Sequence, residues 1–427
     1  MDNRVAVIGT GYVGLTTGAC FAHLGHEVIC ADIDASKIER LSRGEIPIHE
    51  PGLAEIVEEG LQAGRLSFTT DTVAAVSDAG FVYLCVPTPQ GADGSADLTY
   101  LEAAALQIAP HLQPETIVVN KSTVPVGSAS FVEQVLGRSD VHVVSNPEFL
   151  REGSAVHDFL NPDRVVIGSA DQGAAIRIAG LYLGLPAPLM VTDPASAETI
   201  KYAANAFLAM KLSFVNAVAN LCEVLDADVN DVVLGMGYDK RIGHDFLRPG
   251  PGWGGSCFPK DSRALQYMAR EAGYDFTILD TLLDSNDAQF DRVAAKVTRM
   301  VGGSVDGLRI AAWGLTFKAN TDDRRDSPAI EVLRRLSAAG AEITAFDPTV
   351  TGPMAEMPEV AIAEDACGAC EDADVLVVLT EWDDFKWVDL EKVAAVMRHA
   401  RVVDARNLLD RGQVRRRGFE YDGIGRH

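Results

Sequence analysis

Short runs rich in valine and isoleucine alternate with helical stretches through the first half of the chain. Runs that are apolar on both faces are typical of strands buried on both sides of a parallel sheet. Their alternation with helices is the βαβ pattern, which predicts a parallel sheet covered by helices on both faces. The predicted strands are residues 5–8, 27–31, 81–86, 117–121 and 141–145.

The pattern changes from about Ala195. Residues 196–229 contain no proline or glycine, and their apolar residues recur at helical spacing. We therefore expect one long helix there, and further helices at 262–271 and 277–296.

The α/β pattern returns from Gly307, so the chain is predicted to be α/β at both ends with a helical middle. The tail from Arg411 is basic and mixed, and we expect it to be poorly ordered. The predicted elements of this second α/β part are strands at 309–314, 342–347, 375–379 and 401–404 and a helix at 327–339.

An excess of acidic residues narrows the classes of partner. The 427 residues include 37 basic and 61 acidic side chains, which gives a formal net charge of −24. Such a chain repels nucleic acid and anionic membranes, so an anionic ligand needs a locally basic site. We find no secretory signal and no apolar run of membrane-spanning length, and we expect a cytoplasmic protein.

Seven cysteines are scattered along the chain, and an odd number in a long chain does not indicate a disulfide framework. This fits a reducing compartment. Cys367 and Cys370 form a single CxxC without a second pair or histidines at ligand spacing, so no metal site is expected. We expect both cysteines on or beside a helix that precedes the strand at 375–379.

Residues 9–14 form a GxGxxG motif between a predicted strand and a helix. In this context the first glycine makes a tight turn, the second admits a pyrophosphate, and the third allows close packing of helix on strand. Asp32 ends the next strand, eighteen residues after Gly14, where a carboxylate accepts hydrogen bonds from a ribose. A carboxylate there repels a 2′-phosphate, which favours NAD over NADP, although Lys37 lies nearby. A glycine-rich turn without a ligand is the alternative.

Residues 254–261 place Cys257 at the predicted start of a helix, with glycines before it and a proline two residues after it. The helix dipole favours a thiolate at such a position, and Lys260 would lower the thiol pKa further. Asp261 lies four residues on and shares a helical face with the cysteine. The preceding glycines leave room for a substrate to approach. The segment therefore indicates covalent catalysis, or an ordinary cap followed by a buried cysteine.

Lys201 and Asn205 lie four residues apart on the predicted long helix, where an ammonium and an amide on one face can stabilise an oxyanion. Periodicity alone favours a solvated surface lysine. Two loops that follow strands, 121–123 and 146–152, add Thr123 and two carboxylates, Glu148 and Glu152. Loops at the carboxyl edge of a parallel sheet are where α/β proteins place their sites.

These segments together resemble the nucleotide-sugar 6-dehydrogenases along nearly the whole chain. The resemblance implies an α/β fold with two Rossmann-like, doubly wound domains joined by a central helical domain with one long helix. It also implies an NAD-binding domain at 1–195, a helical dimerisation domain at 196–300 and a nucleotide-sugar domain at 301–427. The motifs that carry it are GTGYVG at 9–14, EPGL at 50–53, CVPTP at 85–89, KSTVPVG at 121–127, NPEFLREG at 146–153, NPDRVVIG at 161–168, KYAANAFLAMKLSFVN at 201–216, GWGGSCFPKD at 252–261, WGLTFKANTDDRRDSPA at 313–329 and DARN at 404–407.

The resemblance implies a role for each matched residue. Cys257 is the nucleophile, and Lys201 and Asn205 steady the oxygen of the tetrahedral species. Asp261, Thr123 and Glu148 position water and manage protons. The residues implied to contact NAD are Gly9, Gly11, Tyr12, Val13, Gly14, Asp32, Lys37, Thr88, Thr123, Glu152, Lys260 and Arg325. Those implied to contact the sugar nucleotide are Glu148, Phe149, Leu150, Lys201, Asn205, Phe246, Leu247, Arg248, Gly254, Cys257, Phe317, Lys318, Arg406 and, from the partner in a homodimer built on the central helix, Arg241.

The implied reaction oxidises a primary alcohol to an acid with two NAD⁺ in sequence. A thiolate traps the aldehyde as a thiohemiacetal, and the thioester that follows is hydrolysed by a held water. The motifs favour UDP-glucose over GDP-mannose and UDP-N-acetylated sugars. Two other classes stay open: a two-electron dehydrogenase of the hydroxyacid type, which needs neither the cysteine nor a second α/β part, and a non-catalytic NAD-binding protein.

Overall fold

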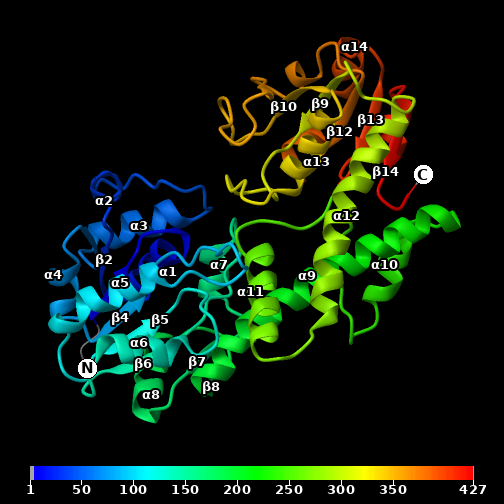
Figure 1. Cartoon of the computed structure of the whole chain (residues 1–427). Coiled ribbons are helices and arrows are strands. Elements are labelled where there is room, and N and C mark those ends of the chain that lie inside the picture. Colours follow the sequence, from blue (N-terminus) through cyan, green and yellow to red (C-terminus); the bar gives the residue numbers. More distant parts are fainter. Residues whose placement is uncertain (1–3, 427) are drawn as a thin grey trace. The chain divides into compact units, whose positions relative to one another are not determined.

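The computed structural model describes residues 4–426, which form two compact units. Unit 1 is the chain up to Ala204 together with Arg263–Asp275, and unit 2 is Asn205–Ser262 with the chain from Phe276 onward. Two helices, α9 (Pro194–Leu225) and α11 (Phe258–Glu271), both labelled in Figure 1, carry residues of both units. Because the central helices are shared between the units, the division into three domains stays a prediction.

The described part of unit 1 is built on an eight-stranded sheet with the order β3-β2-β1-β4-β5-β6-β7-β8. The five predicted strands are present as β1, β2, β4, β5 and β6. The five predicted strands pair in parallel, as expected. The exception among neighbouring strands is β6 with β7, a strand that was not predicted, which pair antiparallel through Ser145 and Gly168. The chain reverses before β7, so β7 and β8 run opposite to the rest. The strands are β1 (Arg4–Ile8), β2 (Glu27–Ala31), β3 (Leu66–Thr69), β4 (Phe81–Leu84), β5 (Ile117–Asn120), β6 (His142–Ser145), β7 (Val165–Gly168) and β8 (Leu189–Thr192).

Helices cover both faces of this sheet (Figure 1). Helices α1, α3, α7 and α8 bury apolar side chains with Val5 and Val7 of β1, whereas α4, α5 and α6 pack with Ala6 and Ile8. Successive residues of β1 therefore enter opposite cores, as the period of a strand requires. The helices are α1 (Tyr12–His23), α2 (Ala35–Ser42), α3 (Leu53–Gln62), α4 (Thr72–Ser77), α5 (Thr99–Ile108), α6 (Ser128–Leu136), α7 (Ala155–Leu160) and α8 (Gln172–Leu181), with a 3₁₀ turn at Ala109–His111.

The long helix predicted at 196–229 is shorter than expected. Helix α9 ends at Leu225, and α10 (Val229–Gly237) begins after Asp228, whose side chain caps it by accepting from Asn230 N. Asp226 has φ of +55°, a left-handed conformation that stops the helix. Aspartate tolerates this conformation better than most residues, and no glycine or proline marks the break. The helices predicted at 262–271 and 277–296 are present as α11 and α12 (Thr277–Met300).

Helix α9 is long and apolar enough, by length and composition alone, to cross a membrane. This corrects the expectation that no apolar run reaches that length. Its buried polar residues argue against such a role, because Glu198 and Lys201 are hydrogen-bonded within unit 1 and Asn216 within unit 2. We therefore describe α9 as a core helix rather than a membrane span.

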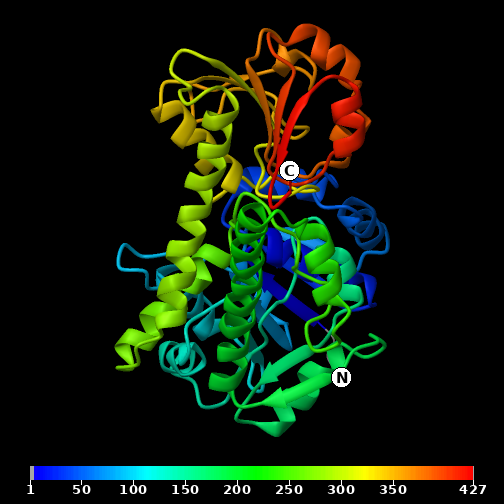
Figure 2. The ribbon, with the colours of Figure 1, turned by 90° about the vertical axis from the view of Figure 1, so that its right-hand side faces the viewer.

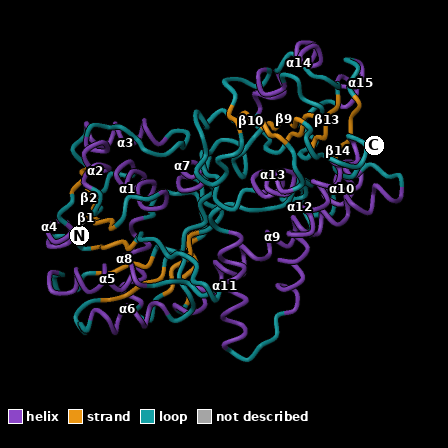
Figure 3. Tube along the Cα trace, turned by 45° about the horizontal axis from the view of Figure 1, so that its top comes forward, coloured by secondary structure: helices purple, strands orange, loops and turns teal. Residues whose placement is uncertain are grey.

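The described part of unit 2 contains a six-stranded parallel sheet with the order β11-β10-β9-β12-β13-β14. The second α/β part predicted from Gly307 onward is therefore present, and Figure 3 shows its strands between helices and loops. The CxxC cysteines lie at a 3₁₀ turn that precedes β12. The elements are β9 (Arg309–Trp313), α13 (Pro328–Ala338), β10 (Glu342–Phe346), β11 (Ala361–Ile362), β12 (Val375–Val378), α14 (Leu390–Val396), β13 (Arg401–Asp404), α15 (Arg411–Arg416) and β14 (Glu420–Gly423), with 3₁₀ turns at Gly368–Cys370 and Asp383–Trp387.

The basic tail from Arg411 is ordered, which corrects the sequence prediction. It forms α15 and then β14, which joins the sheet beside β13, as the red segment of Figure 2 shows. Phe419, Tyr421 and Ile424 are buried between the tail's charged residues. Asp422 pairs with Lys296 of α12 at 3.0 Å. The apolar residues alternate with polar ones as in a strand, and the surrounding arginines obscure this alternation in the sequence.

Candidate active site

The glycine-rich turn of unit 1 follows β1 and opens α1, at the point where the strand order reverses between β1 and β4. Gly9 has φ of +97°, and a Cβ on it would lie 2.6 Å from Cys85 O. A Cβ on Gly14 would lie 1.9 Å from Gly9 O, whereas one on Gly11 would meet nothing within 4 Å. The first and third glycines are therefore required by the protein, and the second leaves open space where a phosphate group fits.

Asp32 follows β2 and bonds directly to this turn. Its Oδ2 accepts from Thr10 N at 2.9 Å and Thr10 Oγ1 at 2.7 Å, and it pairs with Lys37 Nζ at 2.9 Å. Burial acts to raise the pKa of Asp32, but these bonds and one from Asp34 N outweigh it and lower the pKa to about 2. A carboxylate that is ionised at neutral pH therefore lies beside the turn, and such a group is suited to accepting ribose hydroxyls and to repelling a 2′-phosphate.

Lys201 of α9 pairs with Glu148, which lies in the loop after β6. The Nζ–Oε1 distance is 2.9 Å, and the exposed fractions of the two residues are 3% and 5%. Glu148 Oε2 also accepts from Leu150 N at 2.6 Å, and Lys201 Nζ lies 5.4 Å from the centre of the Phe149 ring. Lys201 is therefore a buried, paired lysine and not the solvated surface residue that periodicity alone favours.

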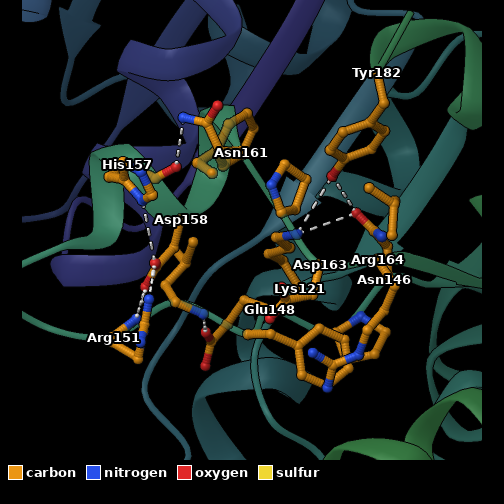
Figure 4. A pocket seen from close by; sticks show the side chains of 16 residues that line it. Lys121, Asn146, Glu148, Arg151, His157, Asp158, Asn161, Asp163, Arg164 and Tyr182 are labelled. Atoms are coloured by element: carbon orange, nitrogen blue, oxygen red, sulfur yellow. Dashed lines mark hydrogen bonds and ion pairs between the residues drawn. The ribbon is translucent and has the colours of Figure 1, made fainter. Parts of the chain in front are cut away.

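A cavity of about 140 Å³ adjoins this loop (Figure 4). On its wall Lys121 Nζ donates to Asn146 Oδ1 at 3.2 Å and to Tyr182 OH at 3.3 Å, and the phenol donates to the same Asn146 oxygen at 2.5 Å. The Arg164 guanidinium lies 3.7 Å from the centre of the Phe149 ring. The start of the loop is therefore fixed by buried polar contacts at Asn146.

Two further loops of unit 1 carry predicted residues. Thr88 Oγ1 donates to Thr123 O at 2.9 Å, so the segments after β4 and β5 are joined.

The loop after β6 also carries Glu152. In the next residue, Gly153 N donates to Tyr12 OH at 2.8 Å and to Glu50 Oε2 at 2.6 Å. The loop that carries Glu152 is thereby tied to the first residue of α1. Sequence reasoning assigned no site role to Glu50, although the EPGL motif contains it.

In unit 2, Cys257 directly precedes α11, as predicted, with Pro259 in the first helical turn. Asp261 N donates to Cys257 O at 2.8 Å, and Ser256 Oγ lies 3.5 Å from the sulfur. Lys260 Nζ pairs with Asp261 Oδ1 at 2.6 Å, so this lysine has a carboxylate partner beside the thiol. Asn205 Nδ2 donates to Asp261 Oδ2 at 2.6 Å. Cys257, the predicted nucleophile, and Asp261 therefore lie one helical turn apart at the start of α11, and an amide from α9 bonds to the carboxylate.

The glycines before Cys257 are required by contacts within unit 2. A Cβ on Gly254 would lie 1.8 Å from Asp326 O. Gly255 has φ of +82°, and a Cβ on it would lie 2.8 Å from the Phe317 ring. The expectation that these glycines leave room for a substrate is corrected, because backbone and an aromatic ring already occupy that space.

A basic site also forms in unit 2, at the loops after β9 and β13. Arg406 donates from Nε to Leu379 O at 2.8 Å and from a terminal nitrogen to Phe317 O at 2.9 Å. A Cβ on Gly250 would lie 3.2 Å from the same guanidinium, which places the loop of Phe246, Leu247 and Arg248 close by. Lys318 Nζ lies 5.4 Å from the centre of the Phe317 ring. Phe317, Lys318 and Arg406 are thus brought together.

Buried carboxylates hold the two loops of this basic site. Asp404 accepts from Arg406 N at 3.1 Å and from Leu409 N at 2.8 Å, and burial raises its pKa against the effect of these bonds. Asp347 Oδ2 accepts from Leu315 N at 2.7 Å. Asp347 directly follows the second strand of its βαβ unit, β10, as Asp32 directly follows β2 in unit 1. Sequence reasoning missed Asp347, although this equivalent position would have identified it.

The two remaining predicted arginines are each paired with a nearby aspartate. Arg241 pairs with Asp239 at 2.6 Å on the surface of unit 2, where its side chain is 88% exposed. Arg325 pairs with Asp323 at 2.7 Å. In the described part of the chain, no group of three or more His, Cys, Asp or Glu side chains is arranged to hold a metal ion.

Comparison with known proteins gives a match along the chain. Three models of the UDP-glucose/GDP-mannose dehydrogenase family match: the NAD binding domain at residues 3–185, the central domain at 195–288 and the UDP binding domain at 311–411. UDP-glucose 6-dehydrogenase TuaD of Bacillus subtilis is 45% identical over 99% of this chain and 93% of its own length. UDP-glucose 6-dehydrogenase of Rhizobium meliloti is 46% identical over 99% of each. A solved UDP-glucose dehydrogenase from Pyrobaculum islandicum superimposes with a TM-score of 0.90 at 36% identity, over 99% of this chain and 98% of its own.

Proposed function

The chain belongs to the UDP-glucose/GDP-mannose dehydrogenase family, and we propose that it is an NAD-dependent UDP-glucose 6-dehydrogenase that forms UDP-glucuronate. The observation that carries the proposal is the arrangement at Asp261. Its carboxylate is buried between Asn205 and Lys260, one helical turn from Cys257. A two-electron dehydrogenase needs no such pairing of a thiol with a carboxylate.

The residues of the glycine-rich turn fit NAD. The open space at Gly11 would accommodate the pyrophosphate, Asp32 the adenine ribose, and Thr88, Thr123 and Glu152 of the same unit the remainder. A role for Arg325, which belongs to unit 2, stays a prediction from the family resemblance. The chemistry that bound NAD⁺ would supply is the oxidation itself, with one hydride taken from C6 of the alcohol and a second from C6 of the thiohemiacetal. We assign the adenine side of the site to this turn because Asp32 bonds to Thr10, which lies between the first two glycines of the motif.

The covalent chemistry belongs to unit 2. After the first oxidation, the Cys257 sulfur adds to the aldehyde carbon and the carbonyl oxygen becomes a thiohemiacetal oxygen. After the second, the carbon is a thioester. Water then adds to the thioester carbon, the C–S bond breaks, and the acid leaves with the thiol restored. Lys201 and Asn205, which lie on successive turns of α9, supply the charge and amide that stabilise the oxyanion at each stage.

Proton handling falls to Asp261, Thr123 and Glu148. Asp261 is fixed by two hydrogen-bonding partners, and Glu148 is fixed by Lys201 and Leu150 N. Carboxylates held in this way can orient a water for attack on the thioester. The sugar nucleotide is bound by Lys318 and Arg406, which lie within the part of the chain that matches a UDP binding domain.

The decisive experiment is the yield of NADH per mole of UDP-glucose. We expect two NADH and one UDP-glucuronate. A yield of one NADH would instead support a two-electron dehydrogenase, and a clear preference for GDP-mannose or a UDP-N-acetylated sugar would overturn the substrate assignment. An absence of turnover with all of these sugar nucleotides would support a non-catalytic NAD-binding protein.

We also propose a cytoplasmic homodimer through the central helix. Phe207, Phe214 and Leu221 of α9 are 56%, 56% and 54% exposed and recur at intervals of seven, so they form one apolar stripe. Such a stripe is suited to a second helix of the same kind. Arg241 is exposed on the same unit, consistent with a residue that reaches a partner's site.

A further inference from the structure

Glu198 is a buried carboxylate in the first turns of α9 that takes no part in the reaction described above. Its exposed fraction is 3%. Oε2 accepts from Gly127 N at 2.7 Å, and Oε1 accepts from Ala129 N at 3.0 Å and from Ser145 Oγ at 2.8 Å. A single side chain therefore holds two other segments of unit 1.

These segments lead directly to predicted catalytic residues. Gly127 and Ala129 lie at the start of α6, directly after the loop that follows β5 and contains Thr123. Ser145 is the last residue of β6, and Glu148 follows three residues later. Glu198 itself lies one turn before Lys201 on α9. The carboxylate thus connects the three segments that carry Thr123, Glu148 and Lys201.

A carboxylate is well matched to this position. The first N–H groups of α6 have no partner within the helix, and the positive end of its dipole favours an anion. Among the described residues, the ion pairs include none to Glu198, so N–H and hydroxyl groups stabilise its charge. Burial raises its pKa, and the bonds from Ser145, Gly127 and Ala129 oppose that effect.

We propose that Glu198 is a positioning residue for thioester hydrolysis. Its carboxylate holds the loops that carry Thr123 and Glu148 in fixed positions relative to Lys201. This proposal rests on the function proposed above. The position of Lys201 along α9 follows from the helix itself. Glu198 bonds the start of α6 to α9, and it gives the end of β6 a second attachment to α9 beside the Lys201–Glu148 pair. Loss of the carboxylate should therefore disturb water and proton handling more than hydride transfer.

The test is Glu198→Gln in the full-length enzyme. The amide oxygen can accept from one of the two backbone N–H groups at the start of α6, but the amide NH₂ then faces the other N–H, so one of these bonds is lost and the attachment of α6 is weakened. We expect kcat to fall about 10- to 100-fold, with the KM for UDP-glucose within about threefold of wild type. Rapid mixing should show a burst that approaches two NADH per active site, followed by a slow steady phase, because the thioester accumulates.

Two further variants make the result specific. Asp374→Asn removes another buried carboxylate, which accepts from Arg309 N in unit 2, and should lower the melting temperature without producing a burst. Ser145→Ala removes a single hydrogen bond to Glu198 and should produce a smaller burst of NADH. If Glu198→Gln does not fold, this variant replaces it as the test, and a Ser145→Ala enzyme without a burst would then overturn the proposal. A folded Glu198→Gln enzyme with wild-type kcat and no burst would overturn the proposal. A wild-type enzyme that yields one NADH per sugar would overturn the proposed function instead.

Discussion

Asn205 donates from Nδ2 to Oδ2 of Asp261 over 2.6 Å, and both side chains are buried. The other carboxylate oxygen lies 2.6 Å from Lys260 Nζ. Because both oxygens have a partner, the carboxylate cannot rotate freely. A fixed carboxylate next to a nucleophile is suited to orienting a water molecule.

Asp261→Asn should block the step that follows the second hydride transfer. The amide keeps the shape of the side chain but cannot take a proton from water, so we expect kcat to fall by about 10²- to 10⁴-fold. Rapid-mixing measurements should show about two NADH per active site before the slow phase. Steady turnover at the wild-type rate would contradict the assigned role.

Cys257→Ser should abolish the complete oxidation while leaving cofactor binding nearly unchanged. A hydroxyl is a much weaker nucleophile than a thiolate, so we expect acid formation to fall by more than about 10³-fold. The NAD⁺ dissociation constant, measured by calorimetry, should stay within about twofold. Cys367→Ser is the matched control, because Cys367 is also partly exposed and should leave turnover intact. Normal amounts of acid from Cys257→Ser would rule out a covalent intermediate.

Asp32→Ala should weaken NAD⁺ binding without changing the two-to-one stoichiometry. Loss of charge-assisted hydrogen bonds to the ribose costs about 1.5–3 kcal/mol, which corresponds to a 10- to 100-fold rise in the dissociation constant. Discrimination against NADP⁺ should fall in the same variant. Because its pKa is lowered to about 2, Asp32 contributes stability that is present above the usual aspartate range and is lost as the pH falls toward 2. Unchanged affinity for both cofactors would contradict its role.

Lys318→Ala should raise the KM for UDP-glucose about 10- to 100-fold and leave the KM for NAD⁺ unchanged, because the lysine belongs to the basic site of unit 2. Lys386→Ala is the control, since Lys386 pairs with Asp383 on the surface. Steady-state kinetics with UDP-glucose and NAD⁺ varied in turn give the two KM values separately for each variant. An equal rise in both constants would show that Lys318 has a general structural role.

Phe214→Asp should dissociate the proposed homodimer, because a charge in the middle of the apolar stripe would be buried without a partner. Sedimentation velocity should show a dimer for the wild type and a monomer for the variant. Trp387→Asp changes an aromatic residue outside the stripe that is 85% exposed, and should remain dimeric. A monomeric wild-type enzyme would exclude the stripe as a homodimer interface.

Much of the fold follows from local pattern. The nine predicted strands are present to within two residues of their expected ends, because most of them are continuous apolar runs. The shorter or more polar strands β3, β7, β8, β11 and β14 were not predicted. The end of α9 at Asp226 was not, because a left-handed aspartate leaves no mark in the spacing of apolar residues. The sequence also did not predict that the tail from Arg411 is folded, because its buried residues Phe419 and Tyr421 lie between charged neighbours.

The candidate site shows a similar limit. Motifs located Cys257, Lys201 and Asp32, since each lies in a recognisable local segment. Their partners could not be read from those segments, because Glu148 meets Lys201 across 53 positions of sequence and Asn205 meets Asp261 across 56. Such contacts depend on tertiary folding rather than on local spacing.

The carboxylates that hold the loops of both units have a consequence for attempts to exchange those loops between related enzymes. Glu50, Glu198, Asp347 and Asp404 bond backbone N–H groups of loops near predicted site residues. Three of the four lie outside the loop segment they hold, up to 103 positions away for Glu50 and Gly153. A loop transplanted without its distant carboxylate would lose its anchor. A graft intended to change substrate preference should therefore transfer loop and anchor as a pair.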